Sequence, residues 1–202
     1  MSARPSYAED RAEIEDLMAR YLFAMDWNDY DTYAECFAED GVLDYAMGCT
    51  EGRENIRAEA KRFKENVGAI YVRPDGKPAK LRHVVAHKAI RIDGDRAWNT
   101  GVWFEMADDG PEGALKMGSF GHYEDELVRV AGEWKFQRRK IYNEFLKDRG
   151  SSPVNPVRLM DQAADSAGEI REQDHEGFRG AYRLRHRRRQ WRGHRHRTQF
   201  AQ

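Results

Sequence analysis

The stretch RYLFAMDW, residues 20–27, places a carboxylate at the end of an apolar helix face. The apolar residues of this segment recur at steps of three and four, which is typical of a buried stripe: Ile14, Leu17, Met18, Tyr21, Leu22 and Met25. With about 100° of rotation per residue, Asp26 falls at the rim of the stripe beside Leu22. There the carboxylate caps the turn, reaches water, or points into a cavity in which it needs a partner.

Histidine is the partner that would give this carboxylate a chemical task, because neutral imidazole is a suitable general base near neutral pH and a carboxylate on its other nitrogen fixes the tautomer. Four of the seven histidines lie beyond residue 174, which leaves His83, His87 and His122. If no bulge intervenes, His83 shares a strand face with Leu81, Val85 and His87. The opposite face then carries Val84, Ala86, Ile90 and Ile92. A strand histidine is equally compatible with a structural role.

The elements that must position these residues follow from the apolar periodicity. It predicts helices over residues 8–27 and 52–63, and a short helix between an N-cap at Asn28 or Asp29 and a stop at Gly41. A strand is predicted over 42–45, and a period of two predicts four more, over 80–92, 97–106, 117–130 and 133–145. Turn-like breaks between these four indicate antiparallel neighbours. The fold class is therefore α+β, with three helices packed on a curved sheet.

Charge is distributed unevenly along the 202 residues. The net charge is -1 and the mean hydropathy is -0.90, yet residues 177–202 contain nine arginines and no acidic residue, which leaves -10 on residues 1–176. We expect a domain over 1–148 and a linker with an Arg/His-rich, disordered tail over 149–202. Such a tail binds nucleic acid only nonspecifically, through its charge.

Location and cofactors are inferred from missing signals. No run approaches the roughly 18 apolar residues of a membrane-spanning helix, and no signal-peptide core is present, so we expect a cytoplasmic protein without membrane contact. Cys36 and Cys49 show no metal-binding or redox spacing and are expected to be free thiols. Phosphate-loop, dinucleotide, nucleophile-elbow and zinc-protease motifs are absent, so we expect no cofactor and no metal.

The order of elements and several motifs resemble one known family. They are AEIEDLMARYLFAMDWNDYDTYAECFAEDGVLDY, GRENI, LRHVVAHKAIRIDGDRAWNTG and HYEDELVRVAGEWKFQRRKI, within residues 10–145. The chain resembles the SnoaL-like branch of the nuclear-transport-factor-2-like superfamily of cone-shaped α+β barrels, which includes scytalone dehydratase, bile acid 7α-dehydratase and hexachlorocyclohexane dehydrochlorinase. Bile acid 7α-dehydratase and scytalone dehydratase are the nearest members.

The resemblance implies a site residue by residue. The family's helix aspartate falls on Asp26, its strand histidine on His83, and the tyrosine of the bile acid dehydratase pattern on Tyr21. Tyr45 occupies a place similar to the first-strand tyrosine of scytalone dehydratase. The second histidine of that enzyme has no clear counterpart here, and Glu105 or His122 is the expected substitute.

The chemistry implied is dehydration without a cofactor. His83 acts as general base oriented by Asp26, and Tyr21 donates a hydrogen bond from a neutral phenol. Substrate-binding candidates are Tyr45, Trp103, Glu105, His122, Tyr123 and Tyr142, which suit a flat, apolar hydroxy-carbonyl compound such as a steroid or polyketide. The alternatives are a ketosteroid-isomerase-like enzyme and a noncatalytic binding or scaffold protein resembling a dioxygenase β-subunit. A homo-oligomer, trimer or dimer, is expected through the outer sheet face.

Overall fold

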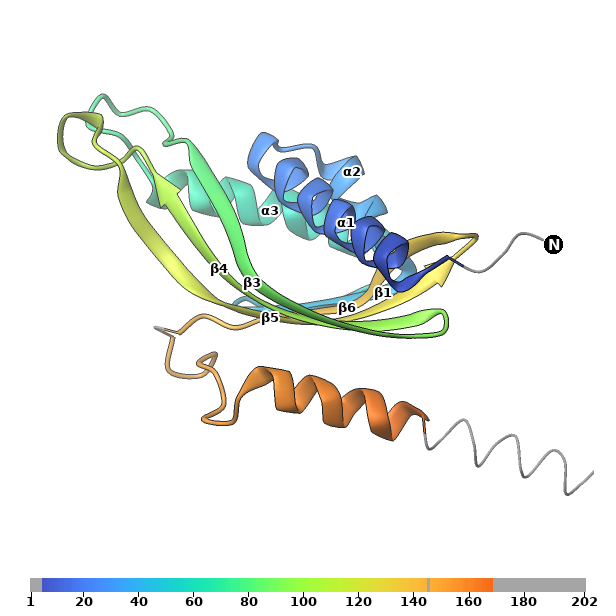
Figure 1. Cartoon of the computed structure of the whole chain (residues 1–202). Helices are drawn as coiled ribbons and strands as arrows, with labels where there is room; N and C mark the ends of the chain where they lie inside the picture. The colour runs from blue at the N-terminus through green and yellow to red at the C-terminus, as the bar shows by residue number, and fades with distance from the viewer. Residues whose placement is uncertain (1–4, 145, 169–202) are drawn as a thin grey trace, which may run out of the picture. The chain divides into compact units, whose positions relative to one another are not determined.

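Three helices lie against the concave face of a curved sheet (Figure 1). The computed structural model describes residues 5–144 and 146–168. In chain order the elements are α1 (Tyr7–Trp27), α2 (Tyr30–Glu35), β1 (Phe37–Tyr45), β2 (Gly48–Glu51), α3 (Arg53–Ile70), β3 (Leu81–Asp93), β4 (Arg96–Ala107), a short 3-10 turn (Pro111–Gly113), β5 (Lys116–Val130) and β6 (Glu133–Ile141).

The six strands form one sheet in the order β2-β1-β6-β5-β4-β3. Strands β3 to β6 pair as antiparallel neighbours, as the sequence predicts, and β1 pairs with β6 in parallel. Among the described residues β2 and β3 remain the sheet edges, so the sheet curls around the helices without closing. The predicted α+β cone is confirmed in this open form.

The first compact unit of the chain runs to Asp161. A helix spans residues 156–168, within the segment expected to be linker and tail. The Arg/His-rich region lies outside the described residues. No helix in the described part of the chain is both long and apolar enough to cross a membrane.

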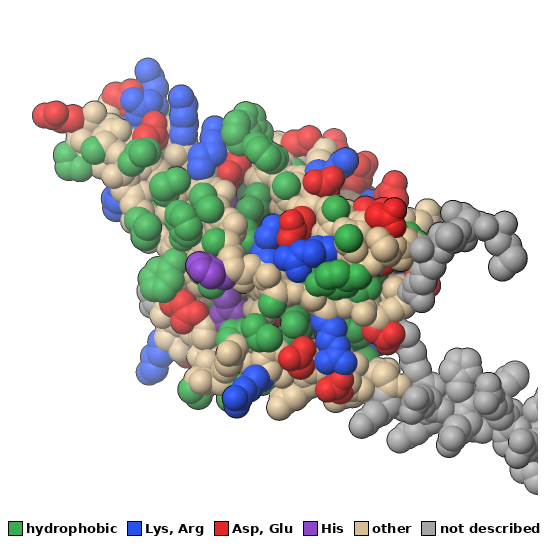
Figure 2. All heavy atoms as spheres, in the orientation of Figure 1, with side chains coloured by type: hydrophobic (Ala, Val, Ile, Leu, Met, Phe, Trp, Pro, Cys, Tyr) green, Lys and Arg blue, Asp and Glu red, His purple; other side chains and the backbone are tan. Residues whose placement is uncertain are grey.

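Helix α1 begins at a capping box, in which the Ser6 side chain accepts from the backbone N–H of Glu9 and the Glu9 carboxylate accepts from the backbone N–H of Ser6. The predicted stripe is buried, with Ile14 and Tyr21 fully excluded from solvent. Figure 2 shows acidic and basic side chains mixed over the helical part of the visible face. Helix α1 ends at Trp27, and the C-cap residue Asn28 adopts a left-handed conformation with φ of 63°. This places Asp26 in the last turn, on the buried side.

Helix α2 is shorter than predicted, because it ends at Glu35 rather than near Gly41. Phe37 already pairs with Phe136 of β6, and the register shifts before Val42. Gly41 lies in this irregular part of β1, where a Cβ atom would come within 3.0 Å of the carbonyl oxygens of Ala38 and Phe136. The glycine therefore permits close backbone approach inside a strand and does not end a helix.

A bulge in β3 corrects the predicted strand faces. His87 has a positive φ of 51°, and the register with β4 shifts between Ala86 and Ala89. The extra residue reverses the alternation, so Ile90 and Ile92 pack with the core on the same side as Val85. Half of the apolar outer stripe expected to support an oligomer is thus part of the core.

We predict that Gly41→Ala lowers the free energy of unfolding by about 1–3 kcal/mol, because the new methyl group would overpack the β1–β6 contact. Urea denaturation measures the change. The matched control is Gly68→Ala in α3, where no atom lies within 4 Å of the added Cβ and alanine favours the helix. Equal stability of the two variants would contradict the close approach at Gly41.

Candidate functional site

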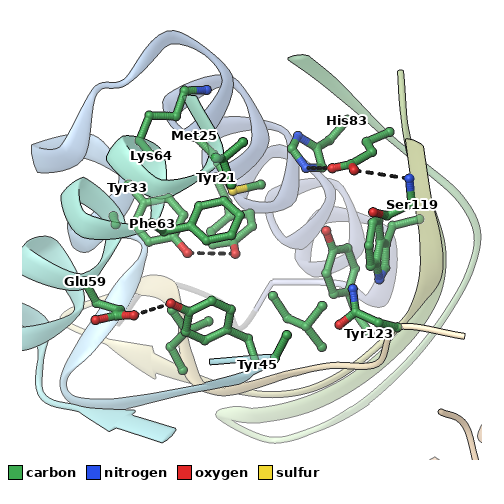
Figure 3. A pocket seen from close by; sticks show the side chains of 18 of the residues that line it. Tyr21, Met25, Tyr33, Tyr45, Glu59, Phe63, Lys64, His83, Ser119 and Tyr123 are labelled. Carbon is green, nitrogen blue, oxygen red and sulfur yellow. Dashed lines mark hydrogen bonds and ion pairs between the residues drawn. The ribbon is translucent and has the colours of Figure 1, made fainter. Parts of the chain in front are cut away.

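A cavity of about 290 Å³ lies between the three helices and the sheet (Figure 3). Its wall is rich in aromatic side chains: Tyr21, Tyr30, Tyr33, Tyr45, Phe63, Tyr71, Trp103 and Tyr123. Helices α1, α2 and α3 supply one part of this wall, and β1, β3, β4, β5 and β6 supply the other. The volume is close to the lower end of the range of small-molecule sites, and such apolar walls with few polar groups are typical of them.

Asp26 and His83 meet at one side of this cavity. The distance between His83 Nδ1 and Asp26 Oδ1 is 2.6 Å, and the second carboxylate oxygen accepts from the backbone N–H of His83 at 3.0 Å. Both side chains are buried, with 6% and 5% of their surface exposed. The last turn of α1 and the beginning of β3 thus hold the two residues by a double contact. The pairing implied by the sequence is present.

Glu105 occupies the other side of the imidazole. Its Oε2 lies 3.2 Å from His83 Nε2, while Oε1 accepts from the Tyr71 hydroxyl at 2.5 Å and from the backbone N–H of Ser119 at 3.1 Å. The β4–β5 register shifts between Phe104 and Met106, which frees the Ser119 amide for this bond. Of the two substitutes that the sequence left open, Glu105 is therefore the one beside His83.

Gly118 provides the space for the Glu105 carboxylate. A Cβ atom at this position would lie 2.8 Å from Glu105 Oε1 and 3.1 Å from the Tyr71 hydroxyl. No side chain fits there unless the carboxylate moves. A bulged strand with a glycine is thus part of the construction of the site.

The two carboxylates favour the protonated form of His83. Burial acts to lower the pKa of His83, but the hydrogen bonds and charges of Asp26 and Glu105 outweigh burial, so the pKa is raised. For Glu105, burial acts to raise the pKa, and the hydrogen bonds from His83, Tyr71 and Ser119 lower it to about 2. The two contacts therefore favour the imidazolium form of His83 over the neutral form.

Tyr21 lies on the same cavity wall but in a different contact. Its hydroxyl is 2.9 Å from the Tyr33 hydroxyl, and either oxygen can donate to the other. The Arg139 guanidinium carbon lies 4.2 Å from the centre of the Tyr21 ring. Burial raises the pKa of Tyr21. Both phenols are therefore neutral. The hydrogen bond between them uses only one of their two hydroxyl protons.

A further polar contact lies at another part of the wall, where Tyr45 donates a hydrogen bond to Glu59 (Figure 3). Arg62 Nη2 pairs with Glu59 at 2.6 Å. Tyr45 thus lines the cavity as the sequence predicted, with its hydroxyl proton directed to a carboxylate.

The remaining predicted binding residues divide into two groups. Trp103 and Tyr123 line the cavity and stack with a centroid distance of 6.0 Å. His122 and Tyr142 do not line it, which corrects their prediction as substrate contacts. Their rings stack on each other at 4.4 Å, and His122 Nδ1 lies 2.8 Å from Ser151 Oγ. His122 alternates with the inward-facing Tyr123 along β5, so it projects from the other face of the strand.

Sequence reasoning missed several lining residues: Tyr33, Glu59, Lys64, Tyr71, Ser119 and Asn143. Tyr33 and Glu59 occupy the apolar faces of α2 and α3, a signal that periodicity could have found. Tyr71 follows α3 in a loop and gave no such signal. The side-chain oxygen of Asn143 is buried and has no hydrogen-bond partner in the described part of the chain.

The fold is the hollow α+β cone of solved structures described as nuclear-transport-factor-2-like with a cystatin-like fold. Residues 6–140 match the SnoaL-like domain, and the chain belongs to this family.

Individual proteins resemble this chain only at low sequence identity. An uncharacterized protein of Mycobacterium tuberculosis, Rv2910c, is 28% identical over 134 residues, which cover 64% of this chain and 82% of the relative. The solved structure of a variant of Rv3472, a protein of unknown function from the same species, is 25% identical, has a TM-score of 0.56 and covers 72% of this chain and 78% of the other. A proposed scytalone dehydratase from Novosphingobium aromaticivorans is 23% identical, with a TM-score of 0.54 and coverage of 73% and 93%.

We predict that Asp26→Asn lowers the pKa of His83, because the variant removes one of the two charges that stabilise the imidazolium. Titration of the His83 ring signals by NMR measures the shift. Because the pKa of His83 is higher in the folded than in the unfolded state, protonation of His83 contributes to the free energy of unfolding. This contribution is fully present below the unfolded value of about 6.5 and is lost as pH rises through the folded-state pKa.

The control for this titration is Asp16→Asn, on the exposed face of the same helix, which should leave the His83 signals unchanged. An unchanged His83 pKa in Asp26→Asn would contradict the ion pair.

Proposed function

We propose that this protein is a cofactor-independent dehydratase that acts on a hydrophobic polycyclic or aromatic hydroxy-carbonyl compound, such as a steroid or a polyketide. The observation that carries the proposal is the buried Asp26–His83 contact of 2.6 Å in the wall of an aromatic cavity. A proton-transfer group in such a position is what removal of a proton next to a carbonyl requires. Membership of the SnoaL-like family and the fold shared with a proposed scytalone dehydratase support the same reaction class.

His83 is the proton-transfer residue in this proposal, and Asp26 is its positioning partner. Asp26 binds both the ring and the backbone N–H of His83, so the imidazole cannot rotate without losing a charged contact. A carboxylate on Nδ1 directs the exchangeable proton to Nε2, on the side of the cavity. Positioned proton transfer of this kind contributes roughly 10²- to 10⁴-fold in rate.

The Tyr21–Tyr33 pair is the proposed donor to the substrate carbonyl oxygen. One hydroxyl of the pair has a proton left over after the 2.9 Å bond between them. As negative charge develops on the carbonyl oxygen during proton removal, a neutral donor in a water-poor wall stabilises it more than it stabilises the ground state. The unpartnered oxygen of Asn143 is an acceptor for a substrate hydroxyl group.

We expect the wild-type protein to convert a hydroxytetralone, the bicyclic β-hydroxy ketone that yields a naphthol on loss of water, with naphthol fluorescence as the readout. His83→Ala should lower kcat/KM by roughly 10²- to 10⁴-fold, and Asp26→Asn should lower it less, since the proton-transfer residue His83 remains. The matched control is His87→Asn, an exposed histidine at the β3 bulge whose left-handed conformation suits asparagine.

The outcomes separate the functional classes. Undiminished turnover in folded His83→Ala would contradict the assigned chemistry. Movement of a double bond without loss of water would indicate the isomerase alternative, and ligand binding without turnover would indicate a binding protein.

A further inference from the structure

Glu105 has contacts that a purely hydrophobic cavity does not require. Both ring nitrogens of His83 are engaged, Nδ1 by Asp26 at 2.6 Å and Nε2 by Glu105 at 3.2 Å. A protonated imidazole in this position has no lone pair with which to remove a substrate proton. The longer of the two contacts is on the side where a substrate must approach. The base of the reaction therefore has to be found next to His83.

We propose that Glu105 is the catalytic base and the His83 imidazolium the catalytic acid of a syn elimination, an inference that rests on the dehydratase function proposed above. Both groups line the cavity, and their reacting atoms are 3.2 Å apart. In a β-hydroxy carbonyl compound, the proton and the hydroxyl that leave are on adjacent carbon atoms. Neighbouring acid and base atoms can reach both leaving groups on one face of the substrate.

The step balances without any further reactant. The Glu105 carboxylate accepts the proton from the carbon next to the carbonyl, and the electron pair of that C–H bond forms the new carbon–carbon double bond. The C–O bond of the adjacent carbon breaks, and the leaving hydroxyl takes the Nε2 proton of His83 and departs as water. Glu105 is then protonated and His83 is neutral. The Glu105 proton passes to Nε2 across their contact, which restores the resting site.

The two proton transfers assist each other electrostatically. The low proton affinity of resting Glu105 is due in large part to the adjacent imidazolium. When His83 gives its proton to the leaving hydroxyl, that positive charge disappears while the burial of the carboxylate remains, so Glu105 becomes a stronger base. Asp26 keeps its 2.6 Å contact with Nδ1, which holds the imidazole in place for the return of the proton to Nε2.

The surroundings of Glu105 fix it for this task. Tyr71 and the Ser119 amide both bind Oε1, so the carboxylate plane is held while Oε2 is left to His83. Lys64, on α3, also lines the cavity, and its charge acts on both Asp26 and Glu105. The charged groups that act on His83 are therefore Asp26 and Glu105, and Tyr71 and Lys64 act on Glu105 in turn.

The experiment compares wild type with Glu105→Gln, which keeps the size of the side chain, on the same hydroxytetralone. Loss of the base should lower kcat/KM by roughly 10²- to 10⁴-fold. Glu124→Gln is the matched control, because Glu124 contacts His122 and Tyr142 outside the cavity. Circular dichroism reports folding, and Tyr71→Phe, which keeps the carboxylate, serves if Glu105→Gln does not fold. Removal of its donor to Oε1 raises the pKa of Glu105 and should move the acidic limb of the pH profile upward.

Stereochemistry and pH provide independent readouts. With substrate deuterated on one face of the carbon next to the carbonyl, syn elimination removes the label only when it is on the same face as the hydroxyl. The kcat/KM of wild type should fall as pH rises through the pKa of His83, because the acid form is needed. A neutral His83 base would give the opposite sign.

The two proposals can fail separately. If wild type releases no water from the probe, the dehydratase function and this inference both fall. If turnover depends on His83 but persists in Glu105→Gln, or rises with pH through the pKa of His83, or follows anti stereochemistry, Glu105 is not the base and the dehydratase function stands.

Discussion

A buried arginine beneath the cavity constrains the rest of the structure. Arg139 on β6 binds Asp125 on β5 through two bonds of 2.8 Å, and Asn99 on β4 donates to the same carboxylate. Its guanidinium lies 4.2 Å from the ring centres of both Tyr21 and Tyr123. Since neither charge can be left alone in the interior, three strands and α1 must keep one mutual arrangement. This arrangement fixes the positions of Tyr21 and Tyr123 in the cavity wall.

The side of the cavity that carries His83 likewise pairs each buried ionisable group with a partner. Asp26, His83 and Glu105 are each unfavourable in an apolar wall when isolated, and they become tolerable because each touches the next. Neutral, flat molecules suit the remaining aromatic wall, because an added negative charge would compete with two carboxylates already present.

Periodicity allowed the prediction of most helices and strands and of the antiparallel order of β3 to β6, because it is a local signal that one chain carries by itself. The contact between Asp26 and His83, which joins distant parts of the chain, was implied by the family resemblance. The sequence did not allow prediction of the contacts of Glu105, because Tyr71 and Ser119 reach its carboxylate from a loop and a bulged strand. Alternation along β3 placed Ile90 outside the core, because no sequence signal marked the bulge that reverses the strand faces. The resemblance offered His122 as a site residue, but His122 lies on the other face of β5 from Tyr123.

The bulge at His87 therefore makes β3 sensitive to length more than to composition. Leu81 to Val85 build the site, and Ile90 and Ile92 build the core, yet the two halves of the strand share a face only because one additional residue separates them. Deletion of that residue would leave nearly every side chain unchanged in type and would turn Arg91 inward and both isoleucines outward. Among relatives, substitutions in this strand should accordingly be tolerated more readily than insertions or deletions of a single residue.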